Sequence, residues 1–172
     1  MITLYGAADS RAQRCLWMLE ELKLEYKHVP TDFRALDKEQ ELIRRNPNGK
    51  VPVLEDQSLV VWESLAINLY LAECYGAPPF WSGVLADRAH TQQWSFWVMT
   101  EVEPPLIDLV MNRALFAEAE RDEVLALVAE KRLQKRFSVL EGVLAGSRYL
   151  LGSKFTAADL NVAGVIAPVS RL

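Results

Sequence analysis

Pro52 and the turn before it constrain the fold of this chain more than any other feature. The segment Asn46-Pro47-Asn48-Gly49 is rich in turn-forming residues, and the apolar run Val51 to Leu54 follows it, so a strand is predicted to begin here. Proline has no backbone N–H and is confined to strand starts and edge strands. The Val51 backbone is therefore predicted to remain free to pair with an added extended peptide.

A hairpin and a helix are predicted directly after this strand start. Asp56 and Gln57 form a predicted tight turn, and Ser58 to Trp62 form the second strand. Apolar residues at helical spacing follow, so Glu63 and Ser64 are expected at the N-terminal end of a helix. Free N–H groups and the positive end of the helix dipole favour a carboxylate there. The alternative is that Ser64 only caps the helix.

The first half of the chain is predicted to form one small α/β layer of order βαβαββα. A strand–helix–strand order at the start implies a parallel pair of strands. The breaker-rich segment 76–83 is expected to link this domain, residues 1–75, to a second one. The elements predicted before the hairpin are a strand over 2–5, a helix over 11–22, a strand over 26–29 and a helix over 37–45.

The second half, residues 84–172, is predicted to be all helical. Helices are expected over 84–102 and 118–144, with an interruption or kink at Glu103-Pro104-Pro105. Further along, Thr156 and Asp159 have the spacing of a capping box in its acidic variant, and Phe155 with Leu160 has that of a hydrophobic staple. These residues are predicted to start a buried helix.

Composition and charge exclude several functional classes. The chain has 172 residues, 51% of them hydrophobic, and a net charge of −4, which gives no electrostatic case for nucleic acid or an anionic membrane. There is no signal-peptide pattern and no apolar run that approaches a membrane span, so a cytoplasmic location is predicted. Cys15 and Cys74 form neither a CxxC nor a metal-binding pattern. Both are expected to be buried structural cysteines.

The order of these motifs resembles the cytosolic glutathione S-transferase family, in its serine-type bacterial and fungal form. The resemblance implies an N-terminal thioredoxin-like domain, a C-terminal helical-bundle domain and a cis Val51–Pro52 bond. It covers nearly the whole chain. The residues that carry it are Leu4-Tyr5-Gly6, Ser10-Arg11, Arg14, Trp17 and Leu19 to Leu22, together with the Val51-Pro52 and Glu63-Ser64 pairs and the Thr156 to Asp159 box.

The same resemblance implies a glutathione site with no metal and no further cofactor. Ser10 matches the hydroxyl that contacts the glutathione sulfur. Lys38 and Lys50 match positions near the glycyl carboxylate, although solvent-facing lysines are the alternative. Val51, with Pro52, matches the backbone that pairs with the cysteinyl residue, and Glu63 and Ser64 match the clamp on the γ-glutamyl group.

The implied mechanism rests on the thiolate, which is the nucleophile. A free thiol of pKa about 8.5 is only about 3% ionised at pH 7, so lowering the pKa by about two units would raise the thiolate to roughly three-quarters. A hydroxyl donor from Ser10, near Arg11 or Arg14, would supply much of this shift. Two alternatives remain: Ser10 only caps the first helix, or Tyr5 makes the sulfur contact. Neither His28 nor His90 has partners that suggest a catalytic triad.

The predicted function is therefore a glutathione transferase that acts on small apolar electrophiles in detoxification, as a homodimer. The alternatives are a non-catalytic interaction module of the same fold and a glutathione-dependent peroxidase or thiol reductase. The electrophile stays open, because Trp94, Trp97, Met99 and Met111 suit either a pocket lining or a helical core. Members of the family usually continue for several tens of residues beyond the capping-box helix, so the sequence is expected to be a truncated form or to lack its tail.

Overall fold

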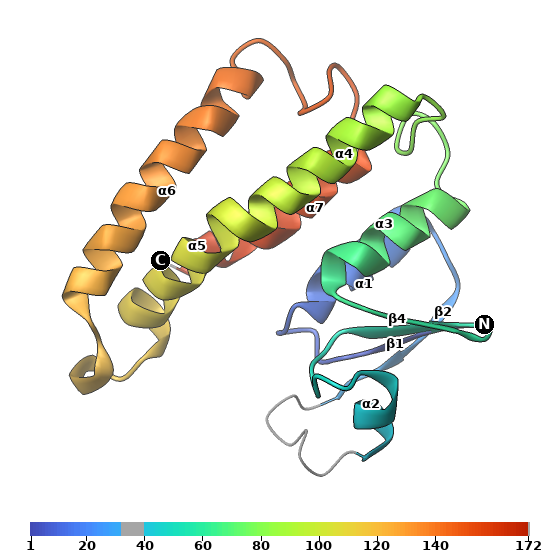
Figure 1. Cartoon of the computed structure of the whole chain (residues 1–172), viewed down its shortest axis with the longest axis horizontal. Coiled ribbons are helices and arrows are strands. Elements are labelled where there is room, and N and C mark those ends of the chain that lie inside the picture. The colour runs from blue at the N-terminus through green and yellow to red at the C-terminus, as the bar shows by residue number, and fades with distance from the viewer. Residues whose placement is uncertain (32–39, 172) are drawn as a thin grey trace. The chain divides into compact units, whose positions relative to one another are not determined.

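The computed structural model describes residues 1–31 and 40–171. It divides into two compact units, Met1–Trp81 and Ser82–Leu172 (Figure 1). In the part of the chain that the structure describes, no helix is both long enough and apolar enough to cross a membrane. Part of the predicted helix over 37–45, and the predicted site residue Lys38, lie outside the described residues.

The first unit has the predicted βαβαββα order. The third strand begins at Val53 rather than at Val51, because Pro52 has no N–H to donate to a ladder. Its elements are β1 (Ile2–Tyr5), α1 (Ala12–Glu21), β2 (Tyr26–Val29), α2 (Gln40–Arg45), β3 (Val53–Asp56), β4 (Leu59–Trp62) and α3 (Ser64–Tyr75).

These strands form one mixed sheet of order β2-β1-β3-β4. β1 and β2 are parallel, as the strand–helix–strand order predicted, whereas β1–β3 and β3–β4 are antiparallel. Helices α1 and α3 cover one face of the sheet and α2 lies on the other (Figure 1). Leu4 and Leu54 are paired across β1 and β3 and fully buried, so the apolar core of this unit includes the sheet itself.

The second unit is helical, as predicted, but its helices are bounded differently. The prolines do not interrupt the helical structure at 103–105. A π-helical segment, Val98–Val102, precedes them, and they lie in the first turn of the next helix, where a missing N–H is tolerated. The helices are α4 (Leu85–Trp97), α5 (Glu103–Val110), a π-helical segment (Met111–Leu115), a 3-10 turn (Glu118–Glu120), α6 (Glu123–Leu144), α7 (Ala157–Ile166) and a 3-10 segment (Ala167–Arg171).

Side-chain caps explain where the last two long helices begin. α6 starts at Glu123 rather than at 118, because the Asp122 carboxylate accepts the Leu125 N–H at 2.9 Å. The predicted capping box at the start of α7 is confirmed, with Thr156 and Asp159 bonded to each other's backbone N–H. Asp159 also accepts the Leu150 N–H at 2.8 Å, so this motif is structural.

The two cysteines differ in their burial. Cys15 is buried, as predicted, and desolvation by burial raises the pKa of its thiol far above the ordinary value. Cys74 is exposed, so the prediction that it is buried was wrong. The buried side chains of α3 recur at helical spacing and end at Ala72, which leaves position 74 on the outward side of the helix.

Candidate functional site

One rung of the sheet brings together the segments that carry the predicted site residues. Tyr5 pairs with Val53, and Val53 pairs in turn with Trp62. The segment after Tyr5, the segment before Val53 and the segment after Trp62 therefore leave the sheet at the same end. They carry the predicted site residues Ser10, Lys50, Val51, Pro52, Glu63 and Ser64.

Close packing at Gly6 places the loop after β1 against Val51. A Cβ atom on Gly6 would lie 2.7 Å from the Ala12 Cβ and 3.1 Å from the Val51 Cβ, and the residue has a φ of +139°, so only glycine fits without displacing the chain. The His28 Nε2 atom lies 2.7 Å from the Gly6 carbonyl oxygen. The loop that ends in Ser10 is thus fixed beside the Val51 strand start.

Ser10 lies at the head of α1, and its hydroxyl makes local hydrogen bonds. The hydroxyl donates to the Ala7 carbonyl at 2.6 Å and accepts the Ala12 N–H at 3.1 Å. The second bond holds the first backbone N–H of α1, but the N-cap position itself belongs to Arg11, which makes no side-chain cap. A hydroxyl can rotate to a different acceptor, and donation to a thiolate would replace the bond to Ala7.

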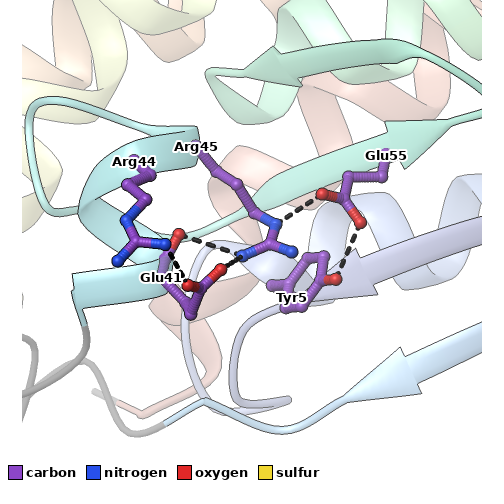
Figure 2. A network of polar contacts seen from close by, with 5 residues as sticks. All are labelled: Tyr5, Glu41, Arg44, Arg45 and Glu55. Carbon is purple, nitrogen blue, oxygen red and sulfur yellow. Dashed lines mark hydrogen bonds and ion pairs between the residues drawn. The ribbon is translucent and has the colours of Figure 1, made fainter.

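Tyr5, the alternative sulfur contact, is engaged elsewhere. Its hydroxyl donates to the Glu55 carboxylate at 2.7 Å (Figure 2). Burial and this hydrogen bond both raise the pKa of Tyr5, and they outweigh the opposite effect of the Arg45 charge. The only proton of the phenol is therefore committed to a carboxylate, which favours Ser10 over Tyr5 as the donor to a thiolate.

The Val51–Pro52 peptide bond is cis, as the family resemblance implied. Val51 lies outside the strands and makes no backbone–backbone hydrogen bond with any described residue. Its N–H and carbonyl are therefore available to a ligand. Lys50 is exposed, and its carbonyl accepts a hydrogen bond of 2.7 Å from the Asn46 side chain.

Asn46 is a residue beside the candidate site whose structural role the sequence reasoning missed. It is buried, and besides holding the Lys50 carbonyl it accepts the Asn48 N–H at 3.0 Å through its side-chain oxygen. The signal was present in the Asn-Pro-Asn-Gly turn, because asparagine at the first position of a turn bonds the backbone two residues on. Asn46 therefore shapes the turn that leads to Val51.

Glu63 and Ser64 stand at the start of α3, as predicted, but Ser64 is not its N-cap. Glu63 takes the N-cap position, with φ 74° and ψ 117°, and its side chain is exposed. Ser64 is buried, and its hydroxyl accepts a hydrogen bond of 3.3 Å from the Arg14 guanidinium. A buried cation thus lies beside the predicted γ-glutamyl clamp.

The arrangement suits an extended, anionic peptide. Two helix N-termini, of α1 and α3, begin beside the same sheet end, and each favours negative charge. The Val51 backbone provides a donor and an acceptor between them. Among residues 1–31 and 40–171, no group of histidine, cysteine, aspartate and glutamate side chains could hold a metal ion.

Both units match families of known proteins. Residues 1–73 match the family model described as "Glutathione S-transferase, N-terminal domain", and residues 85–172 match "Glutathione S-transferase, C-terminal domain". Glutathione S-transferase GstB from Escherichia coli (strain K12) is 31% identical over 170 residues, which are 96% of this chain and 82% of that protein.

Solved structures give the same result. Glutathione transferase F2 from Populus trichocarpa superposes with a TM-score of 0.89 at 27% identity, over 98% of this chain and 82% of that one. The theta class glutathione S-transferase from Xanthomonas axonopodis pv. citri, solved with glutathione bound, has a TM-score of 0.86 at 32% identity, over 94% of this chain and 79% of that one.

Proposed function

The chain belongs to the glutathione S-transferase family, and we propose that it joins the glutathione thiolate to small apolar electrophiles at the sheet end described above. The observation that carries this proposal is the single rung Tyr5–Val53–Trp62, from which the segments bearing Ser10, Val51 and Glu63 all depart. A relative of the same fold was solved with glutathione bound.

In this proposal, glutathione lies as an added strand along the Val51 backbone. Its cysteinyl residue pairs with the free N–H and carbonyl of Val51. The γ-glutamyl group lies at the start of α3, where Glu63 attracts its ammonium group and the helix N-terminus with Ser64 attracts its carboxylate. Lys50, with Lys38, attracts the glycyl carboxylate.

The chemical step needs no nucleophile from the protein. The thiol loses its proton to solvent, and the thiolate attacks the electrophilic carbon. Either a leaving group departs with its electron pair, or the pair moves into a conjugated system that then takes up a proton from solvent. At the head of α1, the Ser10 hydroxyl donates its hydrogen bond to the thiolate in place of the Ala7 carbonyl. A hydrogen bond to a charged group contributes about 1.5–3 kcal/mol, which corresponds to about one to two units of thiol pKa.

We also propose that the enzyme is a cytoplasmic homodimer with a role in detoxification. Support for the dimer comes from α6, where four apolar side chains are exposed within two helical turns: Val124, Leu125, Leu127 and Val128. Such a patch is typical of an interface. Sedimentation that shows a monomer at tens of micromolar would argue against the dimer.

The variant Ser10→Ala tests the mechanism. Glutathione affinity should stay within about three-fold, since Val51, Glu63 and Ser64 hold the peptide, while the pKa of the bound thiol should rise by about one to two units and turnover at pH 6.5 should fall roughly ten-fold. Tyr5→Phe is the control and should leave the thiol pKa unchanged. A lower melting temperature with an unchanged thiol pKa would make Ser10 a helix cap only.

A panel of electrophiles and hydroperoxides tests the reaction class. Conjugation of aryl halides or enones supports the proposed transferase, and the ultraviolet absorbance of the product measures it. Reduction of hydroperoxides without conjugation would favour the peroxidase alternative. Glutathione binding without either reaction would favour the non-catalytic alternative.

A further inference from the structure

A network of charged side chains ties the C-terminal end of α2 to the sheet (Figure 2). The Arg45 Nε atom donates to the Glu55 carboxylate on β3, and the same carboxylate accepts the Tyr5 hydroxyl from β1. The Arg45 guanidinium also lies 4.9 Å from the centroid of the Tyr5 ring. A second carboxylate, that of Glu41 on α2, lies 3.0 Å from Arg45 Nη1.

Among the described residues, α2 has little other packing against the rest of the unit. The helix has six residues, of which only Leu42 is buried, and a helix of that length is not stable by itself. The Arg45 and Glu55 side chains are 24% and 27% exposed, so solvent and salt screen their attraction less than that of a surface pair. The position of the α2 end therefore depends largely on Arg45.

The end of α2 continues directly into the turn that leads to the site. Asn46 follows Arg45, and it is the residue whose side chain binds both the Asn48 N–H and the Lys50 carbonyl. Val51 follows Lys50. A shift of Arg45 would therefore move Asn46 and, through the Lys50 carbonyl, the backbone that is proposed to pair with glutathione.

We propose that Arg45, held by Glu55 and Tyr5, is a positioning residue that sets the affinity for glutathione and takes no part in the thiolate chemistry. The proposal rests on the glutathione site argued above. It extends that site to the face of the sheet on which α2 lies (Figure 1). A network that only stabilised the fold would change the melting temperature and leave the affinity of the folded protein unchanged.

The test compares Arg45→Gln with Arg44→Gln. Arg44 lies on the same short helix and pairs with the same Glu41, but its side chain is 67% exposed. Among the described residues it makes no hydrogen bond or ion pair with the sheet, so its loss removes a charge without loosening α2. Both variants are assayed by glutathione titration calorimetry and by steady-state kinetics below their melting temperatures.

Arg45→Gln should raise the dissociation constant and the KM for glutathione about five- to ten-fold, with kcat at saturating glutathione within about two-fold of wild type. Arg44→Gln should change each of these by less than about two-fold. Arg45→Lys, which keeps the charge but loses the planar fork, should recover only part of the affinity. Hydrogen exchange at the Asn48, Gly49 and Lys50 amides should accelerate in Arg45→Gln and not in Arg44→Gln.

Several outcomes would overturn the proposal. Equal affinities of wild type and Arg45→Gln, or an equal loss in the Arg44→Gln control, would remove the positioning role and leave the proposed function intact. A fall in kcat with an unchanged KM would place Arg45 in the chemistry instead. A wild type that binds no glutathione would refute the proposed function itself. If Arg45→Gln does not fold, Glu55→Gln is measured in its place and should raise KM about two- to five-fold.

Discussion

Glu55 and Asp56 are adjacent on β3, yet they fix different helices on opposite faces of the sheet. Asp56 is buried and accepts hydroxyl hydrogen bonds from Tyr70, at 2.9 Å, and from Tyr75, both on α3. Glu55 is half-buried and binds Arg45 of α2. On the face covered by α1 and α3, buried Leu54 adds apolar packing to these bonds. On the other face, the charged network around Arg45 links α2 to the sheet (Figure 1, Figure 2).

This difference separates stability from binding within one small sheet. Apolar burial stabilises the folded state in proportion to the buried area, and a close-packed core tolerates few changes of side-chain volume. Substitutions on the α1/α3 face should therefore mainly lower stability. Partly exposed ion pairs contribute little free energy but fix geometry. Substitutions on the α2 face should therefore appear as altered glutathione binding in a folded protein.

The largest expected effect is on the apolar face, from Leu54→Ala. Leu54 is fully buried, so its truncation should lower the free energy of unfolding by about 3 kcal/mol, within the usual range of about 2–5. Urea denaturation measures this change. Leu59→Ala, at a β4 residue that is 42% exposed, is the control and should lose less than about 1 kcal/mol. Equal losses would mean that the apolar face is not the more strongly packed one.

The next largest effect on stability is expected for Asp56→Asn, which is to be compared with the same change at Glu55. The amide would replace a buried carboxylate that accepts two tyrosine hydroxyls, so charged hydrogen bonds become neutral and the new NH2 group is buried. The expected loss is about 2 kcal/mol of unfolding free energy. A loss below about 0.5 kcal/mol would show that the two tyrosines find other acceptors.

Glu55→Gln, the same chemical change one residue earlier, should lower stability less. Its partner Arg45 is partly exposed and also has Glu41, so the expected loss is under about 1 kcal/mol at pH 7. Denaturation of this variant beside Asp56→Asn gives the comparison in one experiment. A loss as large as that of Asp56→Asn would mean that the α2 face contributes to stability as strongly as the other.

The smallest expected effect is the pH dependence of the stability difference between wild type and Glu55→Gln. Burial alone would raise the pKa of the Glu55 carboxyl, but hydrogen bonds from Tyr5 and Arg45 together with the Arg45 charge lower it below the ordinary 4.5. The ionised form is thus favoured by folding, and this contribution is present above the unfolded pKa and lost as the pH falls through the folded one. Wild type and Glu55→Gln should therefore converge in stability as the pH falls below the ordinary pKa of 4.5 and through the lower folded pKa. A gap that persists to lower pH would contradict the shift.

Local pattern was enough to predict much of the first unit. Signatures only a few residues long predict the Asn-Pro-Asn-Gly turn, the hairpin and the start of α3. The capping box at Thr156, in the second unit, is also recognised from four consecutive residues. The presence of Glu63 and Ser64 at one helix start followed from the same signals. Their roles toward a ligand remain predictions.

The contacts between distant segments could not be predicted in this way. Tyr5, Arg45 and Glu55 meet because two antiparallel strands pair in one register, with Thr3 opposite Glu55, and a shift of one residue would have turned Glu55 to the other face. The Arg14 contact with Ser64 likewise joins two helices across the sheet face. Sequence spacing carries no information on such a register.

The backbone at Glu63 shows where folding and ligand recognition require different residues. A φ of 74° is a conformation that glycine adopts readily and glutamate does not, and holding a non-glycine residue there costs of the order of 1–3 kcal/mol. Glycine at this position would ease folding but would remove the carboxylate proposed to meet the ligand's ammonium group. A search for more stable variants would thus select glycine at position 63, and a search for tighter glutathione binding would retain glutamate.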